Sequence, residues 1–568
     1  MDSEKTEDKM MKGSEIVIKC LKRQGVDLVF AYPGGAAIDL HQALIESGIR
    51  VVLPRHEQGG AFAADGYARV SGKVGVCMAT SGPGATNLQT GIADCYLDSI
   101  PAVFITGQVG SSLIGKNAFQ EIDVIGTTRP IVKHSYLIFD VKEIPQVISE
   151  AFELAASGRP GPVVIDLPKN VQQQMCIPDF NVTTRLTKKS SPKARPAEIE
   201  AIRTAIADSK KPCLYFGGGI ISAEASAELL QFMESYNIPT VSTLLGVGAI
   251  PYDHPLYLRW LGMHGTTFAN YTANECDLLL AFGARFDDRV TGDPRNFATT
   301  AKIIHVDIDD SEINKNKFAD IGIVANIRDV LIELNKKPLY REYTEWFAQI
   351  AGWRKQFPMT FEQKSEAIQP QRVVEMLSEL TNGDAIIVPG VGQHQMFAAQ
   401  YYNFKHPRQL LTSGGLGSMG FGLPAAMGAK AACPDKLVVN IDGDGSFQMN
   451  IQELGTIHME DLPIKIIILN NQHLGMVAQW EDRFYGGRRG NTDLTNHLSN
   501  RPYPDFVTIA KGYGIPGREV YKREELEDAL KEMLAAPGSF LLDVHTGYEE
   551  HVLPMIPAGK DYKSTISR

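Results

Sequence analysis

The sequence predicts an α/β protein of three doubly wound domains, each a parallel sheet with helices on both faces. Short β-branched or apolar runs alternate with helical patterns along most of the chain, which is typical of parallel strands joined by helical crossovers. Many of these runs end in loops rich in Gly, Pro or Ser. Because ligands bind at the carboxyl ends of parallel strands, these loops predict binding sites. The length of 568 residues suits three large domains.

The first domain is expected over residues 12–182. Its strands are expected at 28–31, 51–53, 74–80, 102–106 and 162–166. The stretch 183–196 is polar and basic and contains two prolines, so it is interpreted as a linker.

The second domain is expected over residues 197–350 and the third over 370–550, with an irregular region at about 352–369 between them. Strands of the second domain are expected at 213–216, 240–242, 277–282, 302–306 and 323–324. Those of the third are expected at 385–388, 437–441, 465–469 and 539–544.

Composition and charge argue against several classes of protein. The net charge is −10 and Lys and Arg form no long stripe, so nucleic-acid binding is not expected. The chain has no apolar run of the roughly 18–20 residues that span a bilayer. The seven cysteines are far apart without a CxxC motif, and residues 1–11 are polar and charged. These features predict free thiols and a cytosolic enzyme.

The most informative stretch follows the strand expected at 437–441. The turn Asp442-Gly443-Asp444-Gly445-Ser446 comes first, then a helical pattern, a second strand and Asn471. The oxygens of Asp444 and Asn471 would lie at one sheet edge and suit Mg²⁺ shared with a phosphate. The glycines would let the backbone approach a diphosphate, and the amides at the start of the next helix attract an anion. The alternative interpretation is a tight glycine turn and an Asn-rich loop.

GDGS followed by a helix and NN resembles the signature of thiamin-diphosphate (ThDP) enzymes. The resemblance implies Mg²⁺ ligands at Asp444, Asn471 and the backbone carbonyl of His473. Met419 matches a large apolar residue that bends the cofactor into a V. The segment around it also fits a Rossmann fingerprint, GxGxxG, but the preceding RQLLTS is poor strand material. The implied ThDP contacts are Glu57, Gln393, His394, Gly417, Ser418, Met419, Asp444, Gly445, Ser446, Asn471, His473, Gly475 and Met476.

Glu57 is the expected activating residue of this cofactor. A carboxylic acid in an apolar setting, where its pKa rises, can share a proton with the aminopyrimidine ring. Glu57 directly follows a strand and opens a helix of small residues, so it could instead only stabilise a helix N-terminus. The pattern RHEQ…GYAR resembles the family and favours the catalytic role. The same resemblance implies catalytic roles for Gly34, Phe119 and Gln120.

Three further stretches narrow the resemblance. NNQHLGMVAQWEDRFY (470–485), LGMHGT (261–266) and FGARFDDRVTG (282–292) closely resemble the acetohydroxyacid synthases, also called acetolactate synthases, of the biosynthetic type. The likeness runs from about Gly13 to Gly559. It implies decarboxylation of pyruvate and transfer of the two-carbon unit to a second 2-ketoacid, giving 2-acetolactate or 2-aceto-2-hydroxybutyrate. Residues 551–568 would then form a tail near the active-site entrance.

The resemblance also implies a substrate pocket of Arg289, Trp480, Met476, Val477, Lys169 and Lys193. A guanidinium suits the acceptor carboxylate, and the flat face of Trp480 would favour the longer acceptor. Arg289 could instead pair with Asp287 or Asp288, and Trp480 could be a buried core aromatic.

The middle domain resembles the FAD domain of the same family, with the flavin in a non-redox role. Asn326 stands where the family usually carries an acidic residue, which puts one flavin contact in doubt. The implied FAD contacts are Arg185, Gly217, Gly218, Gly219, Thr243, Leu244, Leu261, Gly262, Met263, His264, Gly283, Arg285, Asp287, Asp288, Asp307, Ile308 and Asn326.

As partners, the resemblance implies 2-ketoacid substrates and a homodimer or homotetramer with active sites between chains. It also implies a separate small regulatory subunit. The alternatives are a flavin-dependent pyruvate oxidase, an FAD-independent catabolic acetolactate synthase and an inert homologue. The QWEDRF and RFDDRVTG stretches argue against the oxidase, the middle-domain motifs against the catabolic enzyme, and the presence of Glu57, Asp444 and Asn471 against the inert homologue.

Overall fold

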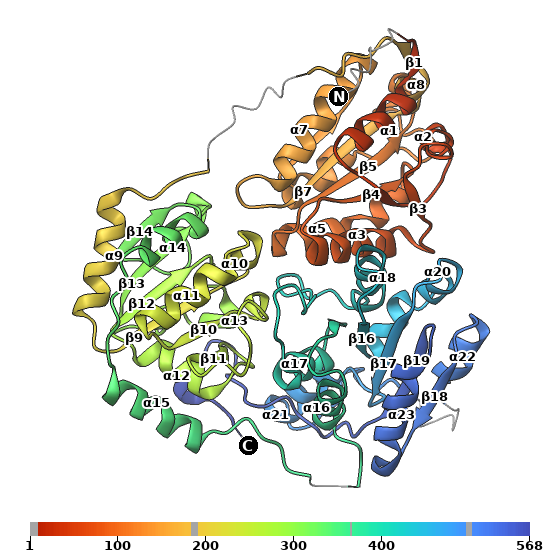
Figure 1. Cartoon of the computed structure of the whole chain (residues 1–568). Coiled ribbons are helices and arrows are strands. Elements are labelled where there is room, and N and C mark those ends of the chain that lie inside the picture. Colours follow the sequence, from red (N-terminus) through yellow and green to blue (C-terminus); the bar gives the residue numbers. More distant parts are fainter. Residues whose placement is uncertain (1–8, 183–190, 364–365, 496–502, 568) are drawn as a thin grey trace.

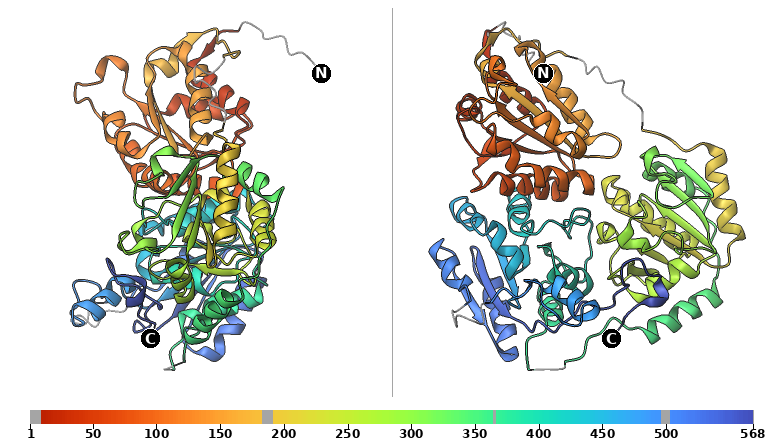
Figure 2. Two further views of the ribbon diagram at one scale, coloured as in Figure 1. Left: turned by 90° about the vertical axis from the view of Figure 1, so that its left-hand side faces the viewer. Right: turned by 180° about the vertical axis from the view of Figure 1, so that it is seen from behind.

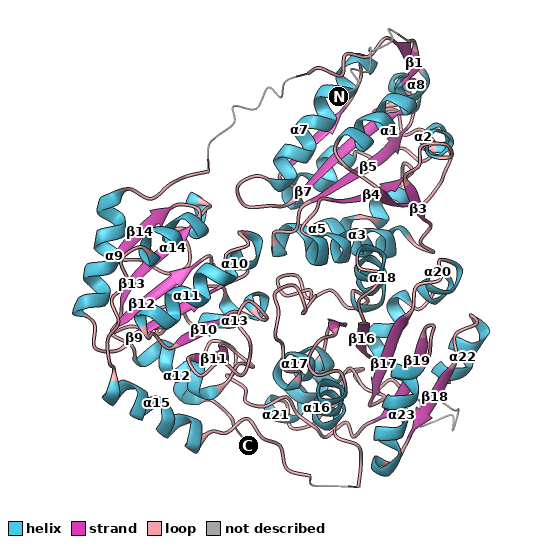
Figure 3. Ribbon diagram, in the orientation of Figure 1, coloured by secondary structure: helices cyan, strands magenta, loops and turns pink. Residues whose placement is uncertain are grey.

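The computed structural model of the chain describes residues 9–182, 191–363, 366–495 and 503–567. Within these ranges the chain forms three lobes, each built on a parallel sheet with helices packed against it (Figures 1 and 3). The predicted fold class is therefore confirmed. Figure 2 shows the same three lobes from the side and from behind.

The N-terminal domain has the strand order β3-β2-β4-β5-β7-β6, and every pair in this sheet is parallel. One face packs on α1, α2 and α7, and the other on α3 and α5. The strands are β2 (Leu28–Ala31), β3 (Arg50–Val52), β4 (Gly75–Ala79), β5 (Ala102–Gln108), β6 (His134–Leu137) and β7 (Pro162–Pro168). The helices are α1 (Gly13–Arg23), α2 (Ile38–Leu44), α3 (Glu57–Ser71), α4 (Pro83–Asn87), α5 (Gln89–Asp98), α6 (Val124–Thr128), α7 (Ile144–Ala156) and α8 (Lys169–Gln173). A small antiparallel pair joins β1 (Met11–Lys12) to β8 (Met175–Cys176).

The central domain has the parallel order β11-β10-β9-β12-β13-β14. Its strands are β9 (Pro212–Phe216), β10 (Thr240–Ser242), β11 (Tyr257–Trp260), β12 (Leu278–Phe282), β13 (Lys302–Asp307) and β14 (Ile321–Val324). Its helices are α9 (Pro196–Asp208), α10 (Gly219–Ser222), α11 (Ser226–Tyr236), α12 (Thr267–Glu275), α13 (Asp288–Thr291), α14 (Ile327–Asn335) and α15 (Thr344–Gln356).

The C-terminal domain has the parallel order β15-β16-β17-β19-β18. Its strands are β15 (Ile386–Pro389), β16 (Val438–Gly443), β17 (Ile464–Asn470), β18 (Gly517–Val520) and β19 (Phe540–His545). Its helices are α16 (Pro370–Leu380), α17 (Gln393–Tyr401), α18 (Gly422–Ala432), α19 (Asp444–Phe447), α20 (Glu453–Met459), α21 (Gly475–Phe484), α22 (Phe506–Gly512) and α23 (Arg523–Ala535).

Helices α3 and α18 join the N-terminal and C-terminal domains, and both are rich in Gly and Ala (Figure 1). A Cβ on Gly66 would lie 2.1 Å from the Ala425 carbonyl oxygen, and one on Gly428 would lie 1.8 Å from that of Ala63. Only glycine permits this approach of two helix backbones. One hydrophobic core crosses this contact, and another is shared by the central and C-terminal domains. The three sheets are therefore tied into one molecule.

The sequence-based expectation is wrong between the second and third domains. Helix α15 continues to Gln356 through part of the stretch expected to be irregular. Trp353 explains this, because its ring contacts the buried Trp346 and also Tyr271. None of the helices in the described ranges combines the length and the apolar character that crossing a bilayer requires.

Candidate active site

Glu57 lies where the chain leaves β3 and enters α3. It is the first residue of the helix, and the ring of His56 caps the helix by accepting a hydrogen bond from the Gln58 amide at 3.2 Å. The Asn87 amide group donates to Glu57 Oε2 at 3.0 Å. Asn87 was not among the predicted site residues. The signal that marks it is the glycine-rich SGPG, which ends one helical turn before it.

Three of the residues predicted to be catalytic gather around segment 80–84, which follows β4. A Cβ on Gly34 would lie 2.4 Å from Thr80 Cγ2, so only glycine fits there. A Cβ on Gly82 would lie 2.8 Å from the backbone oxygen of Gln120, and one on Gly84 would lie 3.4 Å from Glu57 Oε1. The segment thus brings Gly34, Glu57 and Gln120 together. Phe119 differs, because 88% of its surface is exposed.

The second group of predicted residues lies at the carboxyl edge of the C-terminal sheet. Asp444 directly follows β16, and Asn471 directly follows β17. The Asn471 side-chain oxygen accepts a hydrogen bond from the His473 amide at 3.0 Å. The Tyr503 hydroxyl donates to Asp444 Oδ2; Tyr503 was also missed, since it lies 59 residues along the chain.

Asp444 and Asn471 line a cavity of about 90 Å³. Its other lining residues include nearly all those predicted to contact ThDP in this domain: Gln393, His394, Met419, Gly445, Ser446, His473, Gly475 and Met476. Burial raises the pKa of Asp444 to about 6, because its charge is poorly solvated. A divalent cation would offset that cost, so the donor set fits a Mg²⁺-bound diphosphate.

The side chain of Gln393, which lines this cavity, is fixed by three hydrogen bonds. Its amide nitrogen donates to Gln479 Oε1 and to the Glu550 carbonyl, both at 3.0 Å, and its oxygen accepts from Asn471 at 3.3 Å. A Cβ on Gly475 would lie 2.3 Å from the Gln393 oxygen. Gly475 therefore allows the backbone at the start of α21 to pack closely against Gln393.

A larger cavity of about 1020 Å³ lies between the central and C-terminal domains and reaches the N-terminal domain. Its size and mixed polar and apolar lining fit a flavin dinucleotide. The residues predicted to contact FAD that line it are Gly217, Gly218, Gly219, Thr243, Leu244, Leu261, Met263, His264, Gly283, Arg285, Asp287, Asp288, Asp307, Ile308 and Asn326. Gly262 lies beside this lining, at φ +105°, and Arg185 lies outside the described residues.

Two of the glycines that line this cavity, Gly217 and Gly219, pack against the backbone of Gly283. A Cβ on Gly217 would lie 2.3 Å from the Gly283 oxygen, and one on Gly219 would lie 2.7 Å from Gly283 Cα. The turns after β9 and β12 therefore touch each other. Gly218 is freer, since its Cβ would meet only Leu245, at 3.3 Å.

Two carboxyl-edge residues of the central sheet face the same cavity. Asp307, the last residue of β13, is buried, and this burial raises its pKa to about 6. Asn326 caps α14 by accepting a hydrogen bond from the Arg328 amide at 2.9 Å. Residue 326 therefore lines the cavity even though its side chain is an amide and not a carboxylate.

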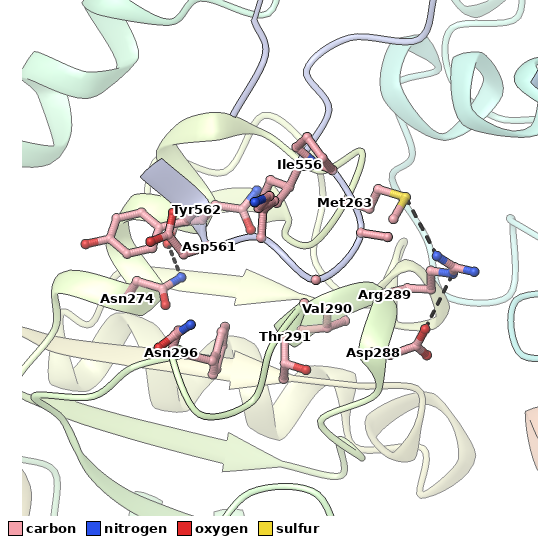
Figure 4. A pocket seen from close by; sticks show the side chains of 17 residues that line it. Met263, Asn274, Asp288, Arg289, Val290, Thr291, Asn296, Ile556, Asp561 and Tyr562 are labelled. Carbon is pink, nitrogen blue, oxygen red and sulfur yellow. Dashed lines mark hydrogen bonds and ion pairs between the residues drawn. The ribbon is translucent and has the colours of Figure 1, made fainter. Parts of the chain in front are cut away.

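The predicted acceptor residues Arg289, Met476, Val477 and Trp480 line the large cavity as well. Arg289 lies between Met263 and Asp288 (Figure 4). Its ion pair with Asp288 is long, 3.8 Å, and both side chains are more than half exposed, so the pair holds the guanidinium only weakly. Trp480 is only partly buried and contacts Phe484, which does not fit a core aromatic.

The C-terminal segment closes over this corner of the central domain. A small cavity of about 60 Å³ lies between it and helices α12 and α13 (Figure 4). The Ile556 amide donates to the Met263 carbonyl, and the Met263 amide donates to the Arg289 carbonyl, both at 2.8 Å. The backbone of Arg289 is thereby tied to the C-terminal segment.

Comparison with known proteins agrees with this geometry. Three family models match: "Thiamine pyrophosphate enzyme, N-terminal TPP binding domain" over residues 11–127, the central domain of the same enzymes over 199–334, and the C-terminal TPP binding domain over 390–544. The chain is 52% identical to acetolactate synthase of Arabidopsis thaliana, over 99% of this chain and 85% of that protein. It is 53% identical to acetolactate synthase 2 of Nicotiana tabacum, over 99% and 86%.

The chain belongs to the acetolactate synthase family. It is therefore an enzyme with the ThDP-binding domains of that family, thiamine pyrophosphate being another name for thiamin diphosphate.

The cellular location expected from the sequence is also wrong. These acetolactate synthases are named as chloroplastic proteins, which contradicts the expected cytosolic location. That expectation rested on the free cysteines together with the polar, charged residues 1–11. Free cysteines do not distinguish the cytosol from another reducing compartment.

Within the described part of this acetolactate synthase chain, the two groups of predicted site residues, one around Glu57 and the other around Asp444, line no common cavity. Among the described residues that line the two cavities, Gly34, Glu57, Phe119 and Gln120 are absent. Lys169, at the start of α8, and the exposed Lys193 are absent from both linings as well.

Proposed function

We propose that the chain decarboxylates pyruvate and joins the two-carbon unit to a second 2-ketoacid. Two pyruvates give 2-acetolactate and CO₂, and pyruvate with 2-ketobutyrate gives 2-aceto-2-hydroxybutyrate and CO₂. This is the first common step of branched-chain amino-acid biosynthesis. The observation that carries the proposal is the meeting of the Asp444 cavity with a cavity lined by Arg289 and Trp480; Met419, Met476 and Val477 line both.

The Asp444 cavity is proposed to hold ThDP through Mg²⁺. Asp444, Asn471 and the His473 carbonyl would bind the ion, and the amides of Gly445 and Ser446 would face the diphosphate. When bound, the cofactor supplies a carbon nucleophile for the keto group of pyruvate. The apolar side chains of Met419 and Met476 keep water from the reacting groups.

Glu57 is proposed to exchange a proton with the aminopyrimidine of the cofactor. Asn87 fixes its carboxyl group by donating to Oε2, and Gly84, without a side chain, leaves space beside Oε1. Gly34 and Gln120, gathered on segment 80–84, would lie close to the same reacting atoms. Phe119 would flank them once a second chain covers it.

Arg289 is proposed to bind the carboxylate of the acceptor ketoacid and Trp480 to select its length. The guanidinium is accessible from the cavity and only weakly paired. A flat aromatic face that contacts one extra methylene gives roughly 10- to 200-fold discrimination. Met476 and Val477 complete the apolar side of this pocket.

The large cavity is proposed to bind FAD without a redox role, since the net reaction transfers no electrons. Asp307 lies at a strand end, where a carboxylate can bind ribose hydroxyls. Gly218 leaves the room that a pyrophosphate needs beside the backbone.

The active enzyme is proposed to be a homodimer or homotetramer in which the Glu57 side of one chain meets the Asp444 side of another. The exposed Phe119 and the absence of Glu57 from the linings of both cavities support this arrangement. Lys169 and Lys193 keep their predicted substrate role only in such an assembly. A separate small regulatory subunit is proposed as a further partner.

The test is an assay of the purified protein for acetolactate from pyruvate, with ThDP, Mg²⁺ and FAD each omitted in turn. We expect activity only when all three are present. Pyruvate-dependent oxygen uptake or flavin reduction without acetolactate would instead identify an oxidase. Full activity of a colourless protein without FAD would identify the catabolic type.

A further inference from the structure

A buried group of charged side chains joins the N-terminal domain to segment 412–418 of the C-terminal domain. Arg69 on α3 pairs with Asp65 one turn earlier and with Asp98 at the end of α5, the latter at 2.8 Å. Asp94 on α5 lies 3.5 Å from the same guanidinium. The three aspartate side chains are fully buried, and that of Arg69 is 8% exposed.

Two of the three carboxylates extend this group to segment 412–418. Asp98 accepts hydrogen bonds from the amides of Gly414 and Gly415, at 2.9 and 2.7 Å. Asp94 accepts from the hydroxyls of Ser413 and Ser418, the latter at 3.2 Å. The segment is therefore held by side chains more than 300 residues away in sequence.

Ser413 is the centre of this arrangement. Its hydroxyl donates to Asp94 and accepts hydrogen bonds from the amides of Gly417 and Ser418, at 3.0 and 2.9 Å. Because its single proton is committed to Asp94, its lone pairs are free for the two amides. These amides belong to the two residues before Met419, which lines both the Asp444 cavity and the large cavity.

Asp65 provides an internal comparison. It is as buried as Asp94 and also pairs with Arg69, and it accepts a contact from the Cys95 thiol at 3.2 Å. Within the described residues, its hydrogen bonds stay inside the N-terminal domain. Asp65 and Asp94 thus share a structural role, but only Asp94 contacts segment 412–418.

We propose that Asp94 and Ser413 are positioning residues that set the backbone before Met419 and so shape the site for the thiamin end of the cofactor. This inference rests on the proposed ThDP site. It means that the N-terminal domain serves the cofactor twice. Glu57 acts on the cofactor that another chain binds, whereas Asp94 supports the cofactor-binding segment of its own chain.

The test measures the dissociation constant for ThDP, in the presence of Mg²⁺, by calorimetry on the purified full-length chain. In Ser413→Ala, which keeps every charge of the group, two backbone amides lose their acceptor. Because both lost hydrogen bonds hold the backbone beside the cofactor site, we expect at least about tenfold weaker binding. Asp94→Ala should weaken binding at least as much.

Asp65→Ala is the matched control, because it removes an equally buried carboxylate from the same arginine. We expect it to lower the unfolding temperature of the apoprotein about as much as Asp94→Ala while leaving the ThDP dissociation constant within about threefold of wild type. Wild-type affinity in Ser413→Ala would overturn the proposal, and so would equal loss of affinity in Asp65→Ala and Asp94→Ala. Binding is measured without turnover, so a wild type that binds ThDP but makes no acetolactate would refute only the proposed function.

Discussion

Glu57 can be tested by a change of one atom. In Glu57→Gln the side-chain oxygen can still accept the hydrogen bond from Asn87, so the fold should persist. The amide can no longer exchange a proton with the cofactor, and we expect acetolactate formation to fall by about 100-fold or more. Glu46→Gln, an exposed position near the end of α2, is the control and should keep wild-type activity. A Glu57→Gln enzyme with near-normal turnover would refute the catalytic role.

Trp480 should govern the choice of acceptor. Trp480→Leu removes a flat ring from the large cavity, so we expect acetolactate synthesis to continue while the preference for 2-ketobutyrate falls about tenfold. The product ratio with both ketoacids present is the measurement. Phe484→Leu removes the ring whose centroid lies 5.2 Å from that of Trp480, and this control should change the product ratio much less. If the ratio stays constant in Trp480→Leu, the pocket assignment is wrong.

Asp166 predicts a pH-dependent stability. It is buried on β7, where the Thr106 hydroxyl and the Gln108 amide donate to it at 2.7 and 2.9 Å, and burial raises its pKa from 3.8 to about 7. Because the folded state holds the proton more tightly, stability falls as the pH rises from about 4 to 7 and is then constant.

The free energy of unfolding that is lost when Asp166 ionises is about 2–4 kcal/mol at most. Asp166→Asn cannot ionise, so the unfolding temperature of wild type minus that of the variant should decrease between pH 5 and pH 7.5. A difference that is independent of pH would contradict the assignment.

At the scale of elements, the α3–α18 contact depends on glycine. Gly66→Ala would place a Cβ 2.1 Å from the Ala425 carbonyl oxygen, so we expect the protein to lose about 2 kcal/mol of stability and much activity, because α3 begins with Glu57. Gly352→Ala is the control: it lies in α15 with nothing within 4 Å of the new Cβ and should stabilise by about 0.5–1 kcal/mol. Urea unfolding of both variants measures these two changes in the free energy of unfolding. Equal stabilities would show that α18 moves aside.

The sequence predicts every inner strand of the three parallel sheets but misses half of their outer strands. β2 and β10 begin and end where expected, whereas β6, β11 and β18 are missed, and each of these is the outer strand of its sheet. Exposed residues such as His134 in β6 and Glu519 in β18 weaken the apolar pattern of these two strands. β11 is mostly buried, and it is short.

The same limit applies to the site. Asp444 and Asn471 follow neighbouring strands in one short stretch, so their spacing alone predicts that they meet. Asn87 is marked only by the SGPG stretch before it, and Tyr503 and the Asp94–Ser413 pair are found only through tertiary contacts. The last pair is 319 residues apart in sequence, and neither residue belongs to a motif that names the other.

At the scale of the whole molecule, the two halves of the site face different spaces of one chain. Glu57 and Gln120 gather on the N-terminal domain, while Asp444 and Asn471 line the C-terminal cavity. Helix α3 nevertheless packs on α18 of its own chain. The chain therefore cannot bring its own Glu57 to its own Asp444 without breaking this contact. An assembly that pairs Glu57 of one chain with Asp444 of another resolves this geometry.

Mixing two inactive variants tests the assembly directly. Glu57→Gln and Asp444→Ala should each abolish activity alone. After joint dissociation and reassembly, a mixed dimer carries one site with both defects and one site with none. Half of the dimers are mixed at random pairing, so about a quarter of wild-type activity should return. Either variant reassembled with itself is the control and should stay inactive. If both side chains instead act within one chain, every site in the mixture keeps a defect and no activity returns.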